Sequence, residues 1–417
     1  MKKVQEPTVR KTLTVATSRI PWQPLIGLLA LIVVMSVVVL SGQELKHVPP
    51  AAPNYIVLHS FAGPPTDGAG PAASLLRDAA GNLYGTTEYG GGAVSACSGG
   101  VVEFGGCGVV FKLSPTGTET VLHTFAGFEA SIEDGANPTT GLIPDAAGNL
   151  YGITWNGGNS CPSGDGCGTV FKLSPSGTET VLYSFNYFAD NAAHPTSLVR
   201  DTAGNFYGTT ETGGDIGTCF NGQDVEQGCG TVFKLSPAGT FSVLHIFTYG
   251  DDGAYPTDLV RDVAGNLYGT TAFGYGTGVF GGACNTGLGC GVVFELIRCS
   301  YAPSGYEFKV LYRFTGGADG GLPLAGLVRD SAGNLYGTTS QGGAESSACT
   351  YHGATLITCG VVFKLSPTGT YTVLHSFTGA DGGNPVAGLI QDTAGNLYGT
   401  TSLGGASDFG VVFKLTP

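Results

Sequence analysis

The chain has 417 residues, enough for two ordinary domains or one large β domain. Glycine accounts for 70 residues, only 12% of the residues are charged, and the net charge is −13. An acidic chain without clustered lysine and arginine excludes binding to a nucleic-acid phosphate backbone. The glycines recur at fixed places between apolar runs, which indicates turns in a repeat rather than a disordered chain.

The N-terminus combines a basic segment with an apolar run. We predict that residues 1–24 are cytoplasmic and that residues 25–42 form a hydrophobic helix. As a helix, Leu25–Leu40 would be about 24 Å long, short of the roughly 30 Å hydrocarbon core of a membrane. Two alternatives remain, a cleaved signal peptide and an uncleaved signal anchor, and the absence of a clear cleavage site favours the anchor. Both place the rest of the chain outside the cytoplasm, with residues 43–53 as a linker.

Residues 54–417 contain six copies of one unit, and each copy carries the motif A-G-N-[LF]-Y-G. The asparagine of this motif stands at positions 82, 149, 205, 266, 334 and 396. In each unit, strand-sized apolar runs alternate with a tight turn, a glycine-rich loop and a second tight turn. The unit is therefore predicted to form four short antiparallel strands, which we call a to d.

Six such units predict an all-β fold, a six-bladed β-propeller built of four-stranded antiparallel blades. Small residues are expected just before the strand-a leucine, because the innermost strands crowd the axis. The six residues at that position are Ser74, Gly141, Ser197, Asp258, Gly326 and Gly388. Asp258 breaks the pattern.

The repeats begin and end out of phase. Residues 57–61 read as a strand d before any strand a, and the last repeat stops after strand c. We therefore predict that residues 57–61 pair with residues 411–415 and close the ring, which removes an open sheet edge. The alternative is an open solenoid with a stray N-terminal strand, which would need capping ends instead.

The motif D-x-A-G-N-L-Y-G-T-T followed by G-C-G-V-V-F-K-L-S-P-x-G-T resembles the Gloeobacter–Verrucomicrobia (GloVer) repeat. The resemblance covers residues 54–417, and the half of each repeat that holds strands a and b is also similar to NHL-type propeller repeats. It implies a bacterial, exported, propeller-like protein of the choice-of-anchor tandem repeat kind. It supplies no reaction and no catalytic residues.

Ten of the 11 cysteines form local pairs in the loops between strands b and c. In an exported protein such pairs indicate disulfides, and the pairs are Cys97/Cys107, Cys161/Cys167, Cys219/Cys229, Cys284/Cys290 and Cys349/Cys359. Zinc binding is the alternative, but these loops lack the two further ligands that such a site needs. Cys299 is unpaired and lies in a c–d turn.

Polar residues that recur in every repeat fit structural roles. An Asp-Gly pair recurs in five of the six loops between strands d and a, with D-N-A-A-H-P in the third, and it indicates a turn rather than a ring of metal-binding carboxylates. One strand-d position holds histidine or tyrosine, which indicates a place for a flat ring with a polar tip. Its six occupants are His59, His123, Tyr183, His245, Tyr312 and His375.

Residues that differ between repeats are the candidates for function. The possible ligand face consists of Trp155, His194, Asp224, Glu226, Asp258 and His352. Ordinary drift of loop sequences would explain the same scatter. Asp258 is the weak candidate for an axial metal ligand.

Together these features predict an exported protein of the cell envelope, attached to the membrane through residues 25–42 or secreted. We expect a monomeric ectodomain, a non-catalytic binding or scaffold module that presents a disulfide-braced loop face to a protein or a glycan. No catalytic residue, cofactor or nucleic-acid partner is predicted. One alternative is a propeller enzyme, of carbohydrate lyase, hydrolase or lactonase type, with an axial metal or ligand site. The other is a purely structural or adhesive role.

Overall fold

The computed structural model describes residues 57–71, 73–92, 97, 105–127, 134–158, 161, 166–214, 219, 228–274, 284, 289–351, 354–406 and 409–417. These residues belong to one compact unit that begins at Ile56. The predicted basic segment, hydrophobic helix and linker lie outside them. Among the described residues, no helix has the length and apolar character that crossing a membrane requires.

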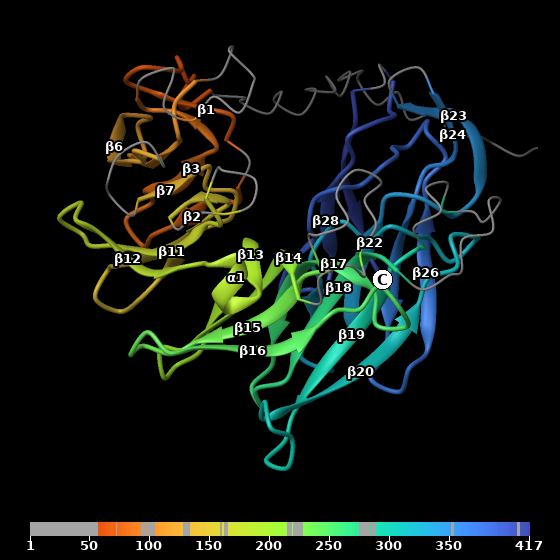
Figure 1. Cartoon of the computed structure of the whole chain (residues 1–417). Helices are drawn as coiled ribbons and strands as arrows, with labels where there is room; N and C mark the ends of the chain where they lie inside the picture. Colours follow the sequence, from red (N-terminus) through yellow and green to blue (C-terminus); the bar gives the residue numbers. More distant parts are fainter. Residues whose placement is uncertain are drawn as a thin grey trace, which may run out of the picture. The chain divides into compact units, whose positions relative to one another are not determined.

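The fold is an all-β, six-bladed propeller, and Figure 1 traces its sheets in chain order from orange to blue. Within each sheet the strands are antiparallel and follow the order a, b, c, d. Blades 1 and 2 are β2 (Leu76–Arg77), β3 (Leu83–Thr87), β5 (Val109–Leu113) and β6 (Glu119–Thr124), then β8 (Ile143–Pro144), β9 (Leu150–Thr154), β11 (Thr169–Leu173) and β12 (Glu179–Ser184). Blades 3 and 4 are β13 (Ala192–Arg200), β14 (Phe206–Gly213), β15 (Thr231–Leu235) and β16 (Phe241–Ile246), then β17 (Ala254–Arg261), β18 (Leu267–Phe273), β19 (Val292–Arg298) and β20 (Tyr306–Arg313). Blades 5 and 6 are β21 (Val328–Arg329), β22 (Leu335–Thr339), β25 (Val361–Leu365) and β26 (Tyr371–Ser376), then β27 (Ile390–Gln391), β28 (Leu397–Thr400) and β29 (Val412–Leu415).

The connecting segments carry little regular structure. Two short strand pairs extend the first two blades at the end that carries the b–c and d–a connections. They are β1 (Gly68–Ala69) with β4 (Tyr89–Gly90), and β7 (Gly135–Ala136) with β10 (Asn156–Gly157). The hairpin of β23 (Glu345–Tyr351) and β24 (Ala354–Thr358) lies in the b–c loop of blade 5, and the only helix among the described residues is α1 (Tyr187–Asp190). We use "loop face" for the face that carries the b–c and d–a connections.

The a–b turn explains the repeated Asp, Asn and Tyr. In blade 2 one oxygen of Asp145 accepts from the backbone N–H groups of Ala147 and Asn149, both at 2.9 Å. The other oxygen accepts from the Asn149 side chain at 2.8 Å and from the Tyr151 hydroxyl at 2.9 Å. The same aspartate, with its Asn and Tyr donors, occurs in all six blades as Asp78, Asp145, Asp201, Asp262, Asp330 and Asp392.

Phenylalanine side chains join each blade to the next. The phenylalanine at the end of strand d of one blade packs edge-on against the strand-c phenylalanine of the following blade, and apart from the half-buried Phe413 the rings that meet are buried between the sheets. The centroid separations are 5.2 Å for Phe125–Phe171, 5.2 Å for Phe185–Phe233, 5.3 Å for Phe247–Phe294, 5.3 Å for Phe314–Phe363 and 5.3 Å for Phe377–Phe413. Within a blade, Phe171 lies opposite Gly152, where a Cβ would stand 2.6 Å from its ring. The glycine of the L-Y-G motif therefore makes room for this ring.

The last blade differs from the prediction. It has three described strands, β27 to β29, and residues 57–61 carry no strand and no hydrogen bond to β29. Phe61 nevertheless lies 5.1 Å from Phe111 of blade 1, which is the contact that every other strand d makes with the blade after it. Residues 57–61 thus contact blade 1 as the strand d of a preceding blade would. The ladder to β29 is the part that is not formed.

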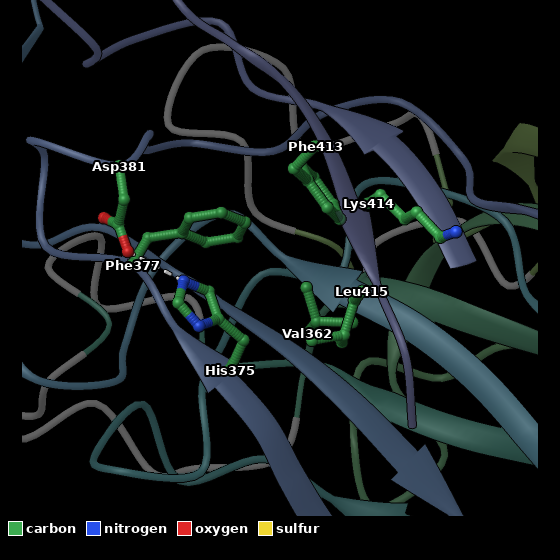
Figure 2. Close-up of a pocket in the computed structure, with 7 residues that line it drawn as sticks. All are labelled: Val362, His375, Phe377, Asp381, Phe413, Lys414 and Leu415. Carbon is green, nitrogen blue, oxygen red and sulfur yellow. Dashed lines mark hydrogen bonds and ion pairs between the residues drawn. The ribbon is translucent and has the colours of Figure 1, made fainter. Parts of the chain in front are cut away.

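The outer edge of β29 is correspondingly bare. Val412 is 82% exposed, whereas the valines at its position in the five other blades are 0% exposed. Figure 2 shows the groove beside this edge, with His375, Phe377 and Asp381 on one side and Phe413 and Leu415 on the other. Its volume is about 190 Å³. Where other blades meet, an aromatic residue near the start of the next strand d fills this place, as in the ring stacks Tyr183–Phe241, His245–Phe308 and Tyr312–Tyr371.

We expect residues 57–61 to pair with this edge and cover it. Val412→Asp should then lower the free energy of unfolding by about 3 kcal/mol or more, because the charge would be buried without a partner. Denaturant unfolding of the full chain measures this. Val263→Asp, at a fully exposed valine, is the control and should change stability by less than about 0.5 kcal/mol. An equally small effect at Val412 would show that the edge stays open.

The aspartate turns predict a loss of stability in acid. Burial by itself raises the pKa of Asp145, but hydrogen bonds from Asn149, Tyr151 and the backbone outweigh it and lower the pKa to about 2. The pKa of Asp392 is also about 2, because the Asn396 side chain and further donors favour its charged form. An unfolded aspartate has a pKa near 3.8, so these turns stabilise the fold fully above about pH 5 and lose that contribution as pH falls toward 2. Unfolding between pH 5 and pH 2 should show this fall, and Asp145→Asn should reduce it. Asp251→Asn, at an 82% exposed side chain, should leave the fall unchanged.

Candidate functional site

Four disulfides brace the loop face: Cys97–Cys107, Cys161–Cys167, Cys219–Cys229 and Cys284–Cys290. They confirm four predicted pairs. Cys359 is also disulfide-bonded, and the side chain of its predicted partner, Cys349, lies outside the described ones. Cys299 is free and partly buried in the c–d turn. Each closed loop is small, so in the chain-entropy account each bond contributes about 2–3 kcal/mol.

These bonds position a ring of residues that precede the innermost strands. Each ring residue has a left-handed backbone, with φ between 52° and 57° at Asn137, His194, Tyr255, Leu322 and Asn384. Each donates its backbone N–H to the carbonyl of the cysteine that ends a b–c loop, at 2.8–2.9 Å. A proline follows each one, before strand a in blades 2, 5 and 6 and within it in blades 3 and 4. In blade 1 the position is Gly70, with φ 67°. We call these six residues the axial ring, because they enter the strands nearest the axis on the loop face.

His194 of the axial ring forms an aromatic pair with Trp155, which lies outside the ring. Trp155 follows β9 of blade 2, and its ring stacks on His194 of blade 3 with a centroid separation of 5.1 Å and an angle of 20°. Nδ1 of His194 lies 2.8 Å from the Thr212 hydroxyl, which holds the imidazole in place. Burial lowers the pKa of His194 to about 4, so the ring is neutral at pH 7. The structure therefore brings together two of the predicted ligand-face residues.

Polar groups adjoin this pair on the same face. Asn137 donates from its side chain to the backbone carbonyl of Glu88 at 3.0 Å, and it accepts from Asn156 at 3.2 Å. Asn156 is the neighbour of Trp155 in the chain. An amide pair thus lies beside the aromatic pair, and both are held by residues of two successive blades.

The next joint contains functional candidates that the sequence did not reveal. Glu211 has the position in blade 3 that Trp155 has in blade 2, and burial raises its pKa to about 7. Burial and then the nearby charge of Glu211 raise the pKa of Tyr255, whose ring meets Phe273 edge-on at 5.6 Å. One sequence signal could have identified Glu211, because the position after the Thr-Thr or Ile-Thr pair of strand b differs between the repeats. Its six occupants are Glu88, Trp155, Glu211, Ala272, Ser340 and Ser402.

Asp258 does not gather metal ligands. Its carboxyl lies against the backbone of Gly326 in the next blade, where an added Cβ would overlap it, and one oxygen accepts from the Leu259 N–H at 2.7 Å. Burial raises the pKa of Asp258 to about 6. Among the described residues, no arginine pairs with Asp258 and no cluster of potential metal ligands includes it. The predicted Asp224, Glu226 and His352 lie outside the described residues.

The strand-d histidines meet the aspartates of the d–a loops. Nε2 of His245 lies 3.2 Å from Asp252, and Nε2 of His375 lies 2.8 Å from Asp381. Tyr312 replaces histidine in blade 4 and donates its hydroxyl to Asp319 at 2.9 Å. These aspartates also accept from backbone N–H groups of the loop, which agrees with the turn interpretation of the Asp-Gly pairs.

Two joints add a glutamate to this arrangement. His59, Asp67 and Glu119 form one cluster, and His123, Asp134 and Glu179 form the other. Within each cluster the potential ligand atoms all lie within 4.8 Å of one another. Burial, and then repulsion by Asp134, raise the pKa of Glu179 to about 7. Two of the strand-d positions that were predicted to hold a flat ring, His59 and His123, therefore belong to clusters of residue types that can bind a metal ion.

Comparison with known proteins confirms the repeat. A family model described as the Gloeobacter/Verrucomicrobia repeat matches residues 45–220, 168–354 and 216–417. Among solved structures, a streptogramin B lyase is similar over 84% of each chain, with 14% identity and a TM-score of 0.47. A virginiamycin B lyase of Staphylococcus aureus is similar over 84% of each chain, with 11% identity and a TM-score of 0.46. PorZ of Porphyromonas gingivalis is similar over 78% of this chain and 38% of its own, with 12% identity and a TM-score of 0.46. A search of curated protein sequences found no match. At these identities the likeness concerns the fold alone.

The stacked pair predicts an unusual titration. Because burial holds the pKa of His194 near 4, protonation of the ring should quench the fluorescence of Trp155 around pH 4 rather than near 6.5. Fluorescence of a Trp22→Phe variant, which leaves Trp155 as the only tryptophan, measures this. His194→Gln should abolish the step. A midpoint near 6.5 would show that the imidazole is solvated.

Proposed function

Since the chain belongs to the Gloeobacter/Verrucomicrobia repeat family, whose repeat here builds a propeller, we propose that it is a non-catalytic binding module with a glycan ligand at its axial ring. The observation that carries the proposal is the Trp155–His194 stack beside the Asn137–Asn156 amide pair. A flat aromatic surface favours the apolar face of a sugar ring, and amides bind its hydroxyl groups. The uncharged state of His194 at pH 7 suits a neutral ligand.

The disulfides support a rigid site outside the cytoplasm. Four bonded pairs indicate an oxidising, extracytoplasmic compartment. The bonds end next to the carbonyls that hold Asn137, His194 and Tyr255, so they limit motion of the ring before a ligand binds. Attachment to the membrane through residues 25–42 belongs to the same proposal, and it would hold the binding face at the cell envelope.

The alternative of a propeller enzyme has less support. An axial metal needs convergent ligands, and the surroundings of Asp258 offer a glycine backbone in the part of the chain that the structure describes. The raised pKa values of Glu211 and Asp258 each arise from burial first and involve no shared partner. A binding surface therefore accounts for the ring with fewer assumptions than a reaction does.

Binding of the full-length protein to a glycan array, followed by calorimetry with the best ligand, tests the proposal. Trp155→Ala should weaken binding at least about tenfold, which corresponds to about 1.4 kcal/mol. Trp155→Phe should retain part of the affinity, because an aromatic surface remains. Tyr301→Ala removes a 75% exposed aromatic residue from the opposite face and should have no effect. Glycan binding that is unchanged by Trp155→Ala, or binding of proteins alone, would contradict the proposal.

A further inference from the structure

The two His–Asp–Glu clusters lie at successive joints of the propeller. In the first, His59 belongs to residues 57–61, Asp67 to the following d–a loop and Glu119 to β6 of blade 1. In the second, His123 belongs to β6, Asp134 to the next d–a loop and Glu179 to β12 of blade 2. Each cluster therefore joins the strand d of one blade to the strand d of the next.

The distances in these clusters suit a shared ion better than direct hydrogen bonds. Nε2 of His59 lies 3.5 Å from Oδ2 of Asp67 and 3.5 Å from Oε2 of Glu119, and Nε2 of His123 lies 3.6 Å from Oδ1 of Asp134. Hydrogen bonds between nitrogen and oxygen are normally about 2.7–3.2 Å long. Ligands of a tetrahedral ion with bonds of about 2.0–2.1 Å stand about 3.3–3.4 Å apart.

The same histidine–aspartate distance can be compared where other blades of this chain meet. Where an aromatic residue takes the place of the glutamate, the histidine closes on its aspartate, as at His245 with Phe308 and Asp252 at 3.2 Å. His375 and Asp381, with no described side chain in that place, are 2.8 Å apart. The wider gap thus coincides with the presence of the glutamate.

Atoms in both clusters lack partners. Nε2 of His59 and of His123, and Oε1 of Glu119 and of Glu179, are shielded from solvent and have no hydrogen-bond partner. Leaving such groups unpaired costs about 1–3 kcal/mol each. The aspartates differ, because Asp67 and Asp134 also accept from backbone N–H groups. The orphaned atoms thus belong to the histidine and the glutamate of each cluster, and at Glu119 the orphaned oxygen is Oε1, while Oε2 lies 3.5 Å from His59.

We propose that each cluster binds one divalent transition-metal ion, zinc by the chemistry of its donors, so that the folded chain holds two. An imidazole nitrogen with two carboxylates is a ligand set that zinc accepts, and water would complete the tetrahedron. Calcium and magnesium fit less well, since both prefer more oxygen ligands and no imidazole. When both carboxylates are ionised they repel each other, and a bound cation would remove this repulsion.

The ions would cross-link neighbouring parts of the propeller. The first would tie residues 57–61 to blade 1, and the second would tie blade 1 to blade 2. Neither cluster includes a residue of the axial ring, so this inference does not depend on the proposed glycan site. It also assigns a ligand role to His59 and His123, which the sequence analysis treated as flat rings with a polar tip.

Zinc content and zinc-dependent stability of the full-length protein test the proposal. After treatment with a chelator and dialysis, calorimetry and elemental analysis should find two zinc ions per chain, and added zinc should raise the midpoint of thermal unfolding. Glu119→Gln and Glu179→Gln should each lose one ion. Glu295→Gln, a glutamate of β19 outside the clusters, should keep both.

Glu179→Phe separates metal binding from folding. It copies the His245–Phe308 stack that the chain already uses at the blade 3 to blade 4 joint. The variant should fold, bind one ion fewer and unfold at a temperature that depends less on zinc. Two ions retained in the Glu→Gln variants, no zinc bound at micromolar concentration, or binding of calcium in its place would overturn the proposal.

Discussion

The contact between a strand-d phenylalanine and the strand-c phenylalanine of the next blade is the constraint on which this structure depends. It recurs at 5.1–5.3 Å from Phe61–Phe111 to Phe377–Phe413. The ring in strand c needs a glycine opposite it in strand b, which explains the glycine of the L-Y-G motif. Because only the strands must match, the b–c loops can vary in length without disturbing the joint.

The contrast between matched strands and variable loops determines where a functional site can lie. The strands and a–b turns repeat the same contacts, so six similar blades provide a scaffold rather than a site. Differences gather in two places: the axial ring on the loop face, and the outer joints where histidine meets glutamate or an aromatic ring. At the ring, a disulfide ends beside each carbonyl that holds a left-handed residue, so the same bonds that stabilise the loops also position His194 and Tyr255.

The sequence predicted the fold well because its signals are local. The Asp-x-Ala-Gly-Asn turn, the strand-sized runs and the spaced cysteines each act within a few residues, and six copies reinforce each interpretation. The predicted site was less complete. Trp155 and His194, both assigned to the possible ligand face, stack on each other because they occupy adjoining positions of successive blades, and the sequence did not predict this contact. Glu211 was missed because the sequence shows its place after the Thr-Thr pair but not the burial that raises its pKa. Asp258 broke a pattern of small residues, yet it meets a glycine of the next blade instead of other ligands.

By itself the sequence determined the class of fold, the number of blades, the strand order within a blade and four of the five predicted cysteine pairs, because period, turn chemistry and local spacing express these directly. Only the tertiary structure decided which side chains of different blades meet. It placed Phe61 on blade 1, paired Trp155 with His194 and set Glu119 and Glu179 facing the histidines of the preceding strand d. Those neighbours are about 60 residues apart along the chain or belong to different repeats, and no local pattern records a contact that arises when two blades pack.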